Sequence, residues 1–139
     1  MEQTGTQISA PSLDANRVAA GGAVLVVDDD PAVKRLIVRA LQLHRYQVFA
    51  AGSYREAHEC FALEGGCIRM LVADIMLGDG NGIILAGELR QRNLGLCVLL
   101  ISGRMDEAWG PCIQSNGYGF LGKPFALPLL LGQVREMLG

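Results

Sequence analysis

The 139-residue sequence lacks the features that define several large classes of protein. It has 12 basic and 14 acidic side chains, and the resulting net charge of -2 gives no basic field for nucleic acid. No apolar run approaches the roughly 18 residues of a membrane helix, and no apolar segment follows Met1 as in a secretory signal. We therefore expect a cytoplasmic domain with no direct contact to nucleic acid or membrane.

Cysteine is too sparse and too scattered to build a disulfide framework or a metal centre. The four cysteines are Cys60, Cys67, Cys97 and Cys112, with no CxxC pair and no histidine at metal-ligand spacing. Cysteines of a cytoplasmic protein are typically reduced. We therefore expect four buried thiols and no bound zinc ion.

Hydrophobic residues, in contrast, make up 50% of the chain, which is enough for the core of one globular domain. Residues 1–22 are rich in Gly, Ser, Thr, Gln and Ala without periodicity, so we expect a flexible N-terminal tail. The domain is predicted to occupy residues 23–139.

Short apolar runs alternate with helical patterns along this domain. The five predicted strands are residues 24–27, 46–50, 70–73, 96–101 and 118–121. Strands that are apolar almost throughout, joined by helices, are typical of a parallel sheet covered on both faces. The sequence therefore predicts an α/β fold, a doubly wound five-stranded parallel sheet.

The helix boundaries follow from the residues that begin or interrupt each helical pattern. Pro31 suits the first turn of the first helix, and Ser53 and Asn81 are predicted to cap the second and third. Gly110-Pro111 interrupts the fourth helix, which should begin at Pro111 or be partly irregular, because proline costs about 3 kcal/mol in a helix interior. The predicted buried stripe of the first helix is Val33, Leu36, Ile37, Ala40 and Leu41, and that of the last is Leu127, Leu130, Leu131, Val134 and Leu138.

Polar side chains follow several of these strands, at the edge of a parallel sheet where sites form. They are Asp28, Asp29 and Asp30 after the first strand, Asp74 after the third, Ser102 after the fourth and Lys123 after the fifth. Neighbouring carboxylates repel one another by about 1 kcal/mol per pair near water and therefore favour a hard divalent cation such as Mg²⁺. We expect Asp29 and Asp74 to bind Mg²⁺ directly and Asp28 to hold one of its waters.

Asp74 then has a free oxygen that could attack a phosphoryl group. A carboxylate nucleophile needs no general base; phosphoryl transfer to it needs alignment and neutralisation of charge on the equatorial oxygens. Mg²⁺, Lys123 and the Ser102 hydroxyl could supply both.

The segments VLVVDDDP, LVADIML, LLISG and GFLGKPF resemble the four signature blocks of the receiver domain of two-component response regulators. The resemblance covers essentially all of residues 23–139 and implies a flavodoxin-like (βα)5 fold with a cis Lys123-Pro124 bond. The roles that it implies are Asp28 and Asp29 as the acidic pair, Asp74 as phospho-acceptor, Met76 as the source of a metal-binding backbone carbonyl, Ser102 as switch hydroxyl, Phe120 as switch aromatic and Lys123 as phosphate-binding lysine.

The activity implied by the resemblance is self-directed and involves no turnover of a separate substrate. The domain takes a phosphoryl group from a phosphohistidine of a histidine kinase or histidine phosphotransfer protein, holds it as an acyl phosphate and later hydrolyses it. The switch then remodels the face made by the fourth helix, fifth strand and fifth helix, where a homodimer or partner contact is predicted. Both a free-standing regulator and a module of a hybrid histidine kinase remain open.

Two other functions compete with this hypothesis. A receiver-like binding module keeps the fold without phosphorylation, but such domains generally lose an acidic residue, the acceptor or the lysine, all of which are present here. A Mg²⁺-dependent phosphohydrolase would use Asp28 and Asp30 as nucleophile and acid. Pro31 follows where such enzymes favour a flexible turn residue, and the chain has no cap domain.

Two segments depart from the usual pattern of the family. Gly78 stands four residues after the acceptor, where proline is usual, so the GDGNG loop of residues 78–82 is predicted to be tight and mobile. A calcium loop starting at Asp79 is rejected because Arg90 occupies its twelfth position. The last helix has no good capping side chain, and we expect it to expose Leu129 on the signalling face.

Overall fold

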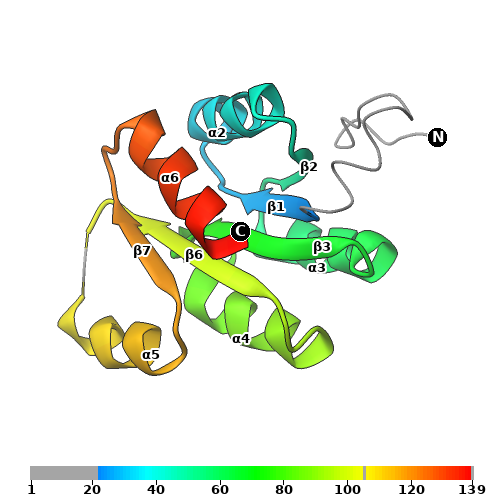
Figure 1. Cartoon of the computed structure of the whole chain (residues 1–139). Helices are drawn as coiled ribbons and strands as arrows, with labels where there is room; N and C mark the ends of the chain where they lie inside the picture. Colours follow the sequence, from blue (N-terminus) through cyan, green and yellow to red (C-terminus); the bar gives the residue numbers. More distant parts are fainter. Residues whose placement is uncertain (1–21, 105, 139) are drawn as a thin grey trace.

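A computed structural model describes residues 22–104 and 106–138, so the predicted tail of residues 1–22 lies outside the described residues except for Gly22. At its centre is a five-stranded parallel sheet with the strand order β2-β1-β3-β6-β7 (Figure 1). The strands are β1 (Ala23–Val27), β2 (Gln47–Ala51), β3 (Ile68–Asp74), β6 (Cys97–Ser102) and β7 (Gly119–Gly122). All five predicted strands are confirmed.

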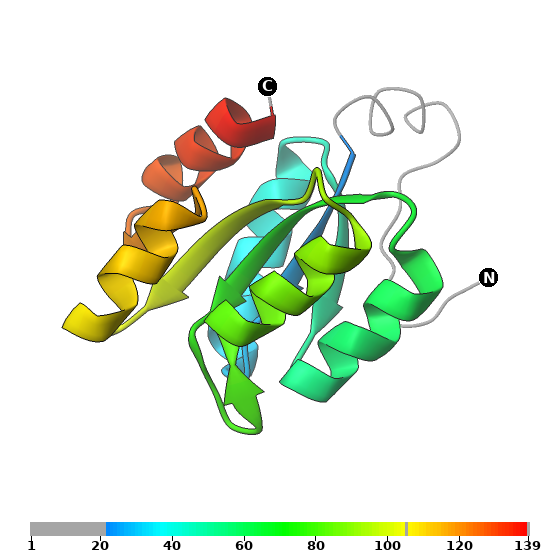
Figure 2. The ribbon, with the colours of Figure 1, turned by 90° about the horizontal axis from the view of Figure 1, so that it is seen from below.

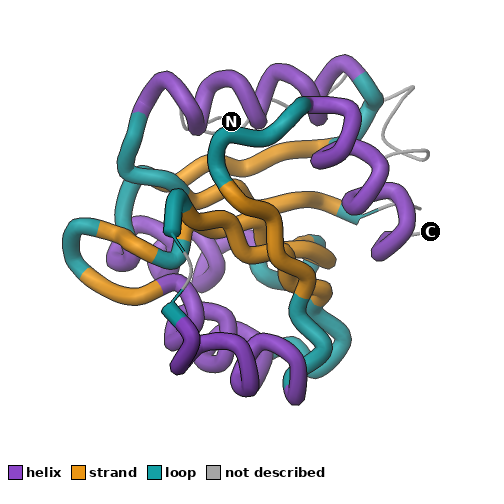
Figure 3. Tube along the Cα trace, turned by 90° about the vertical axis from the view of Figure 1, so that its left-hand side faces the viewer, coloured by secondary structure: helices purple, strands orange, loops and turns teal. Residues whose placement is uncertain are grey.

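Helices cover both faces of this sheet, as Figures 2 and 3 show from two further directions. The helices are α2 (Pro31–Leu43), α3 (Tyr54–Glu64), α4 (Gly82–Arg92), α5 (Gly110–Ser115) and α6 (Leu127–Leu138). Successive strand residues point to opposite faces, so Val26 packs in the core under α2 and α6 while Leu25 packs in the core under α3, α4 and α5. The prediction of a doubly wound α/β fold is confirmed.

Short polar side chains define where the first three of these helices begin. Asp30 accepts from the amides of Ala32 and Val33 in α2, Ser53 accepts from the Glu56 amide in α3, and Asn81 accepts from two amides of α4. Each bond satisfies a backbone donor that the helix itself leaves unpaired. The predicted caps Ser53 and Asn81 are confirmed.

The buried face of α2 differs from its predicted stripe at three positions: Leu36 is exposed, Val33 is half-buried, and Val38 is buried although the stripe did not include it. Leu36 is 51% exposed, and the buried residues are Ile37, Val38, Ala40 and Leu41. The stripe is centred on Ile37 and Leu41, which lie one turn apart, so position 36 falls at its margin. Leu36 instead lines a pocket of about 330 Å³ together with Val33, Lys123, Pro124 and Phe125.

The prediction of four buried cysteines is wrong, because none of the four is fully buried. All four are free thiols, but Cys67 and Cys112 are exposed, whereas Cys60 and Cys97 are half-buried. Cys67 lies in the turn before β3, and Cys112 lies on α5, where only Ile113 is buried.

The segment before β7 is irregular, as predicted from Gly110-Pro111. A 3₁₀ turn, η1 (Glu107–Trp109), precedes α5, which has six residues and carries Pro111 in its first turn. Within the described ranges, no helix has both the length and the apolar character that crossing a membrane requires.

A second, two-stranded sheet was not predicted. β4 (Met76–Leu77) and β5 (Gly80–Asn81) pair antiparallel, with Met76 opposite Asn81 and Leu77 opposite Gly80. This hairpin contains the glycine-rich loop and connects β3 to α4. The loop is therefore a tight turn, as predicted, and the residues on either side of it pair as two short antiparallel strands.

Candidate functional site

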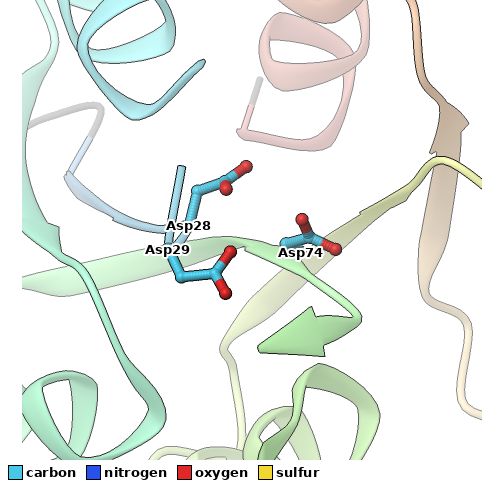
Figure 4. A group of neighbouring side chains, drawn as sticks. All are labelled: Asp28, Asp29 and Asp74. Carbon is cyan, nitrogen blue, oxygen red and sulfur yellow. The ribbon is translucent and has the colours of Figure 1, made fainter. Parts of the chain in front are cut away.

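The carboxylates that follow β1 and end β3 meet at one edge of the sheet. β1 and β3 are adjacent and parallel, with Val27 opposite Ala73, so the next residues, Asp28 and Asp74, come to the same rim. Figure 4 shows Asp28, Asp29 and Asp74 side by side, and one carboxylate oxygen from each lies within 4.8 Å of the other two. Asp28 and Asp74 are buried, whereas Asp29 is exposed.

This donor set fits Mg²⁺. The ion prefers hard oxygen ligands and is usually bound by one or two carboxylates with several waters retained. Buried Asp28 and Asp74 provide fixed oxygens, and exposed Asp29 leaves the site open to solvent. The three carboxylates can therefore hold a small divalent cation without a closed protein cage.

Lys123 directly follows the edge strand β7 and reaches the cluster from there. Its backbone amide donates to the Ser102 carbonyl (2.8 Å), which extends the β6-β7 ladder to the rim. Its Nζ then donates to Asp28 Oδ2 (3.0 Å) and Asp74 Oδ2 (2.7 Å). The structure thus brings Lys123 together with two aspartates that are 49 and 95 residues away in sequence.

Burial and pairing shift the pKa values of this group in defined directions. Burial lowers the pKa of Lys123, but its hydrogen bonds to Asp74 and Asp28 outweigh burial, and the pKa lies above its ordinary value. Burial raises the pKa of Asp28 by more than the Asp30 amide and Lys123 lower it. Lys123 is therefore cationic at neutral pH and provides a permanent positive charge beside Asp74.

The Asp74 carboxylate is held through both of its oxygens. Oδ2 accepts from Lys123, and Oδ1 accepts from the backbone amide of Met76 (2.9 Å), the first residue of β4. The Met76 side chain itself is 48% exposed. Asp74 is thus oriented by the lysine on one side and by the hairpin on the other.

Ser102 and Phe120 lie near this cluster without belonging to it. Ser102 is buried at the carboxyl end of β6, and its Oγ accepts from the Arg104 amide (3.2 Å). Phe120 lies within β7 opposite Leu100 and is half-buried against the core under α3, α4 and α5. The Lys123-Pro124 peptide bond is cis, as the resemblance implied.

Sequence reasoning missed the residues that hold the hairpin beside Asp74. Asp79 accepts from the amides of Tyr54 and Arg55 at the start of α3. The Asp79-Gly80 pair is a known hairpin signal and could have indicated the turn. Nothing in the local pattern indicates which helix Asp79 reaches, because α3 lies about 25 residues earlier.

A five-stranded parallel sheet with an acidic cluster and a lysine at the carboxyl ends of its strands defines a class of signalling domains. The family model described as "Response regulator receiver domain" matches residues 24–135. The chain belongs to this family of two-component signalling domains.

Curated relatives are much longer than this chain. It is 34% identical over 125 residues to the sensor kinase CckA of Brucella abortus (strain 2308), a match that covers 89% of this chain and 13% of the kinase. It is 32% identical over 118 residues to the transcriptional regulatory protein TrcR of Mycobacterium tuberculosis, covering 83% of this chain and 44% of that protein. The chain spans less than half the length of either relative.

Solved structures share the fold. The receiver domain of the hybrid histidine kinase CckA has a TM-score of 0.73 and 27% identity, covering 85% of this chain and all of that one. A CheY-like receiver domain from Methanospirillum hungatei JF-1 has a TM-score of 0.78 at 23% identity, covering 84% of this chain and 93% of that one. The predicted flavodoxin-like receiver fold is confirmed.

Proposed function

We propose that this receiver domain accepts a phosphoryl group onto Asp74 from a phosphohistidine of a histidine kinase or histidine phosphotransfer protein, in a Mg²⁺-dependent reaction. The observation that carries the proposal is the position of Lys123 Nζ, which bridges Asp28 and Asp74 while Asp29 lies beside them. The Lys123 ammonium and the proposed divalent-cation site then flank the oriented carboxylate of Asp74. Transfer of a phosphoryl group to a carboxylate requires this arrangement of charges.

The chain's own residues perform the transfer by orientation and charge. A carboxylate oxygen of Asp74 attacks phosphorus, the P–N bond of the phosphohistidine breaks, and its electron pair returns to the imidazole nitrogen. Lys123, which donates to Asp74 Oδ2 in the structure, then donates to the incoming phosphoryl oxygens. The product is an acyl phosphate that water later hydrolyses.

Asp29 and Asp74 would bind Mg²⁺ directly, Asp28 would hold one of its waters, and Met76 would offer its backbone carbonyl. When bound, the ion neutralises charge on the phosphoryl oxygens. The support for this assignment is the proximity of the three carboxylates and the short link from Asp74 to Met76.

Phosphorylation then acts on the face made by α5, β7 and α6. The Ser102 hydroxyl turns to the phosphoryl group and Phe120 moves inward, so a new charge biases a two-state element. The support for this switch is that Ser102 is buried one strand away from Asp74 and that Phe120 is half-buried and can become more buried. The same face is the proposed contact for a homodimer or another partner.

The domain that does this is proposed to comprise residues 23–139 and to act in the cytoplasm. It serves as a free-standing regulator or as a module of a hybrid histidine kinase. Its phosphodonor would approach over the open rim at Asp29.

The position of Asp30 favours this function over the phosphohydrolase. Asp30 Oδ1 accepts from the amides of Ala32 (2.9 Å) and Val33 (3.4 Å), so its carboxylate caps α2. A hydrolase of the kind considered above needs that carboxylate as an acid beside Asp28. The presence of every acidic residue, the acceptor and the lysine likewise favours phosphorylation over a pure binding module.

Labelling with a small acyl phosphate tests the proposal. In the presence of Mg²⁺, intact mass measurement should show one added phosphoryl group on the wild type and none on Asp74→Asn or after chelation of the metal. Asp30→Asn is the matched control and should still be labelled. Labelling that survives Asp74→Asn, or labelling that disappears from a folded Asp30→Asn, would contradict the proposed function.

A further inference from the structure

The hairpin that begins beside the phospho-acceptor is fixed to it at its base. The Gly82 amide, directly after β5, donates to the Ile75 carbonyl (2.8 Å). A Cβ at Gly82 would lie 2.3 Å from the carbonyl oxygen of Asp74, so only glycine permits this approach. Both ends of the hairpin are therefore anchored to the backbone around Asp74.

The turn of the hairpin is fixed to a different element. Asp79 Oδ1 accepts from the Tyr54 amide (2.8 Å) and Oδ2 accepts from the Arg55 amide (3.1 Å). These are the first two residues of α3, and Ser53 satisfies the next free amide, that of Glu56 (3.0 Å). The hydrogen bonds from Tyr54 and Arg55 lower the pKa of Asp79. An exposed loop carboxylate thus serves as a long-range cap of a helix.

Tyr54 adds a second contact to the same turn. A Cβ at Gly80 would lie 2.5 Å from Tyr54 Cδ2, so the tyrosine lies directly over the glycine of the turn. Its hydroxyl donates to Glu88 Oε1 on α4, and this bond raises the pKa of Tyr54 to about 12. His58 Nε2 lies 2.7 Å from the same Glu88 oxygen. Tyr54 is therefore held in place by α4 while it covers the hairpin.

We propose that Asp79 and Tyr54 are positioning residues for the metal site: they fasten the β4-β5 hairpin to α3 and so hold the Met76 backbone in place for Mg²⁺. The inference rests on the proposed function, in which Met76 offers its carbonyl to the ion. Gly78 precedes Asp79 in the turn, and glycine gives the backbone more conformational freedom than any other residue. Side-chain contacts at Asp79 and Tyr54 replace the restraint that a proline would give to the backbone.

The proposal predicts a loss of metal affinity when the turn is released. A released hairpin must be ordered again when the ion binds, and residues that support metal ligands typically contribute 10- to 100-fold to affinity. Titration calorimetry with MgCl₂ alone should show Asp79→Ala binding about tenfold more weakly than the wild type. Amide hydrogen exchange of residues 76–81 should be faster in this variant.

Ser53→Ala is the matched control. It removes a side-chain cap from the same end of α3 and so lowers stability, but it leaves the hairpin contacts in place. Its Mg²⁺ affinity should equal that of the wild type. At saturating Mg²⁺, Ser53→Ala should be labelled by the acyl phosphate at the wild-type rate, because the contacts of Asp79 and Tyr54 with the hairpin remain in place.

A rescue variant separates backbone restraint from side-chain chemistry. Gly78 has no positive φ, and a Cβ at this position would have only Asp29 Oδ2 nearby, at 3.5 Å. Gly78 directly follows Leu77, which pairs with Gly80, and this position of a turn accepts proline. Adding Gly78→Pro to Asp79→Ala should restore Mg²⁺ affinity. If Asp79→Ala does not fold, Asp79→Asn, which keeps one acceptor oxygen, should give a smaller loss of affinity.

The Mg²⁺ titrations test both the positioning role of Asp79 and the proposed function. Equal Mg²⁺ affinity in the wild type and the Asp79 variants, or an equal loss in Ser53→Ala, would overturn the positioning role. A wild type that binds no Mg²⁺ at all would overturn the proposed function, and the inference with it. The two failures are distinguished by the wild-type titration alone.

Discussion

Helices α3 and α5 cover the same face of the sheet but are fixed in different ways (Figure 2). α3 has 11 residues, buries Ala57 and Phe61, and receives side-chain caps from Ser53 and Asp79. α5 has six residues and buries Ile113 alone, and within the described ranges no side chain caps its first turn. The comparison shows that one apolar face can hold a firm helix beside the proposed metal site and a loose one at the proposed output face, which is made by α5, β7 and α6.

The loose helix is anchored mainly at its carboxyl end. Arg90 of α4 donates through Nη1 to the carbonyl of Asn116, the C-cap of α5 (2.6 Å), and through Nε and Nη2 to Leu96. The same guanidinium lies over the Tyr118 ring, 4.7 Å from its centroid. Movement of this segment should therefore be greatest at η1 and least at Asn116.

Truncation of the buried side chain of each helix should give the largest difference. Phe61→Ala should lower the free energy of unfolding by about 4 kcal/mol, because a buried aromatic side chain leaves a cavity under a helix that cannot detach. Ile113→Ala should cost about 2 kcal/mol, the lower end for such a change, because α5 can open locally. Urea unfolding measures both losses.

Hydrogen exchange gives the control for this pair. Ile113→Ala should accelerate exchange in residues 110–115 and leave α3 unchanged. A loss in Ile113→Ala that equals or exceeds the loss in Phe61→Ala would remove the contrast between the two helices.

Acid should weaken the firm helix through its long-range cap. The pKa of Asp79 is held below the ordinary value of 3.8 by the amides of Tyr54 and Arg55, so the unfolded chain takes up the proton first. The stability that this carboxylate contributes is complete above pH 3.8 and is lost as the pH falls through the lower pKa of the folded state.

Comparison with Asp79→Asn isolates this effect. The wild type should have the higher free energy of unfolding at neutral pH, and the difference should shrink in acid as Asp79 takes up its proton. Urea unfolding over a pH series measures it. A difference that does not change with pH would show that the charge of Asp79 is not what holds α3.

The smallest effect on stability is expected at the amino end of α6, on the proposed output face. Leu129 is 56% exposed, which confirms the predicted exposure, and Leu129→Ser should change the free energy of unfolding by less than about 0.5 kcal/mol. The neighbouring Leu130 is fully buried, and Leu130→Ala should cost about 3 kcal/mol.

In self-association, in contrast, the larger effect is expected from the substitution at the exposed Leu129. If Leu129 belongs to a partner surface, Leu129→Ser should weaken self-association of the phosphorylated domain in sedimentation experiments across a concentration series. Unchanged sedimentation together with unchanged contact to a histidine kinase would remove Leu129 from that surface.

Local patterns in the sequence predicted most of the fold. Ser53 and Asn81 can be identified as caps because each precedes an apolar helical pattern, and the strands can be identified because they are apolar almost throughout. The rim residues could be placed together because parallel strands end at a shared edge. Proximity of Asp28, Asp29, Asp74 and Lys123 followed from that rule alone.

The misses have a common physical cause. Leu36 lies at the margin of a helical stripe, where periodicity cannot separate buried from exposed positions. The β4-β5 hairpin depends on Asp79 and Tyr54, whose contact joins segments about 25 residues apart. Local propensity carries no information about such contacts, so the glycine content of the loop indicated mobility where tertiary contacts provide restraint.

In the proposed function the signal passes between Lys123 and Phe120 along β7, a strand of four residues. Phe120 and Lys123 are three residues apart, about 10 Å along an extended chain. Insertion of one residue between them would keep the lysine at the rim but turn Phe120 toward the opposite layer of helices, because strand side chains alternate. The proposed phosphate chemistry at the rim would then no longer be coupled to the proposed switch at Phe120.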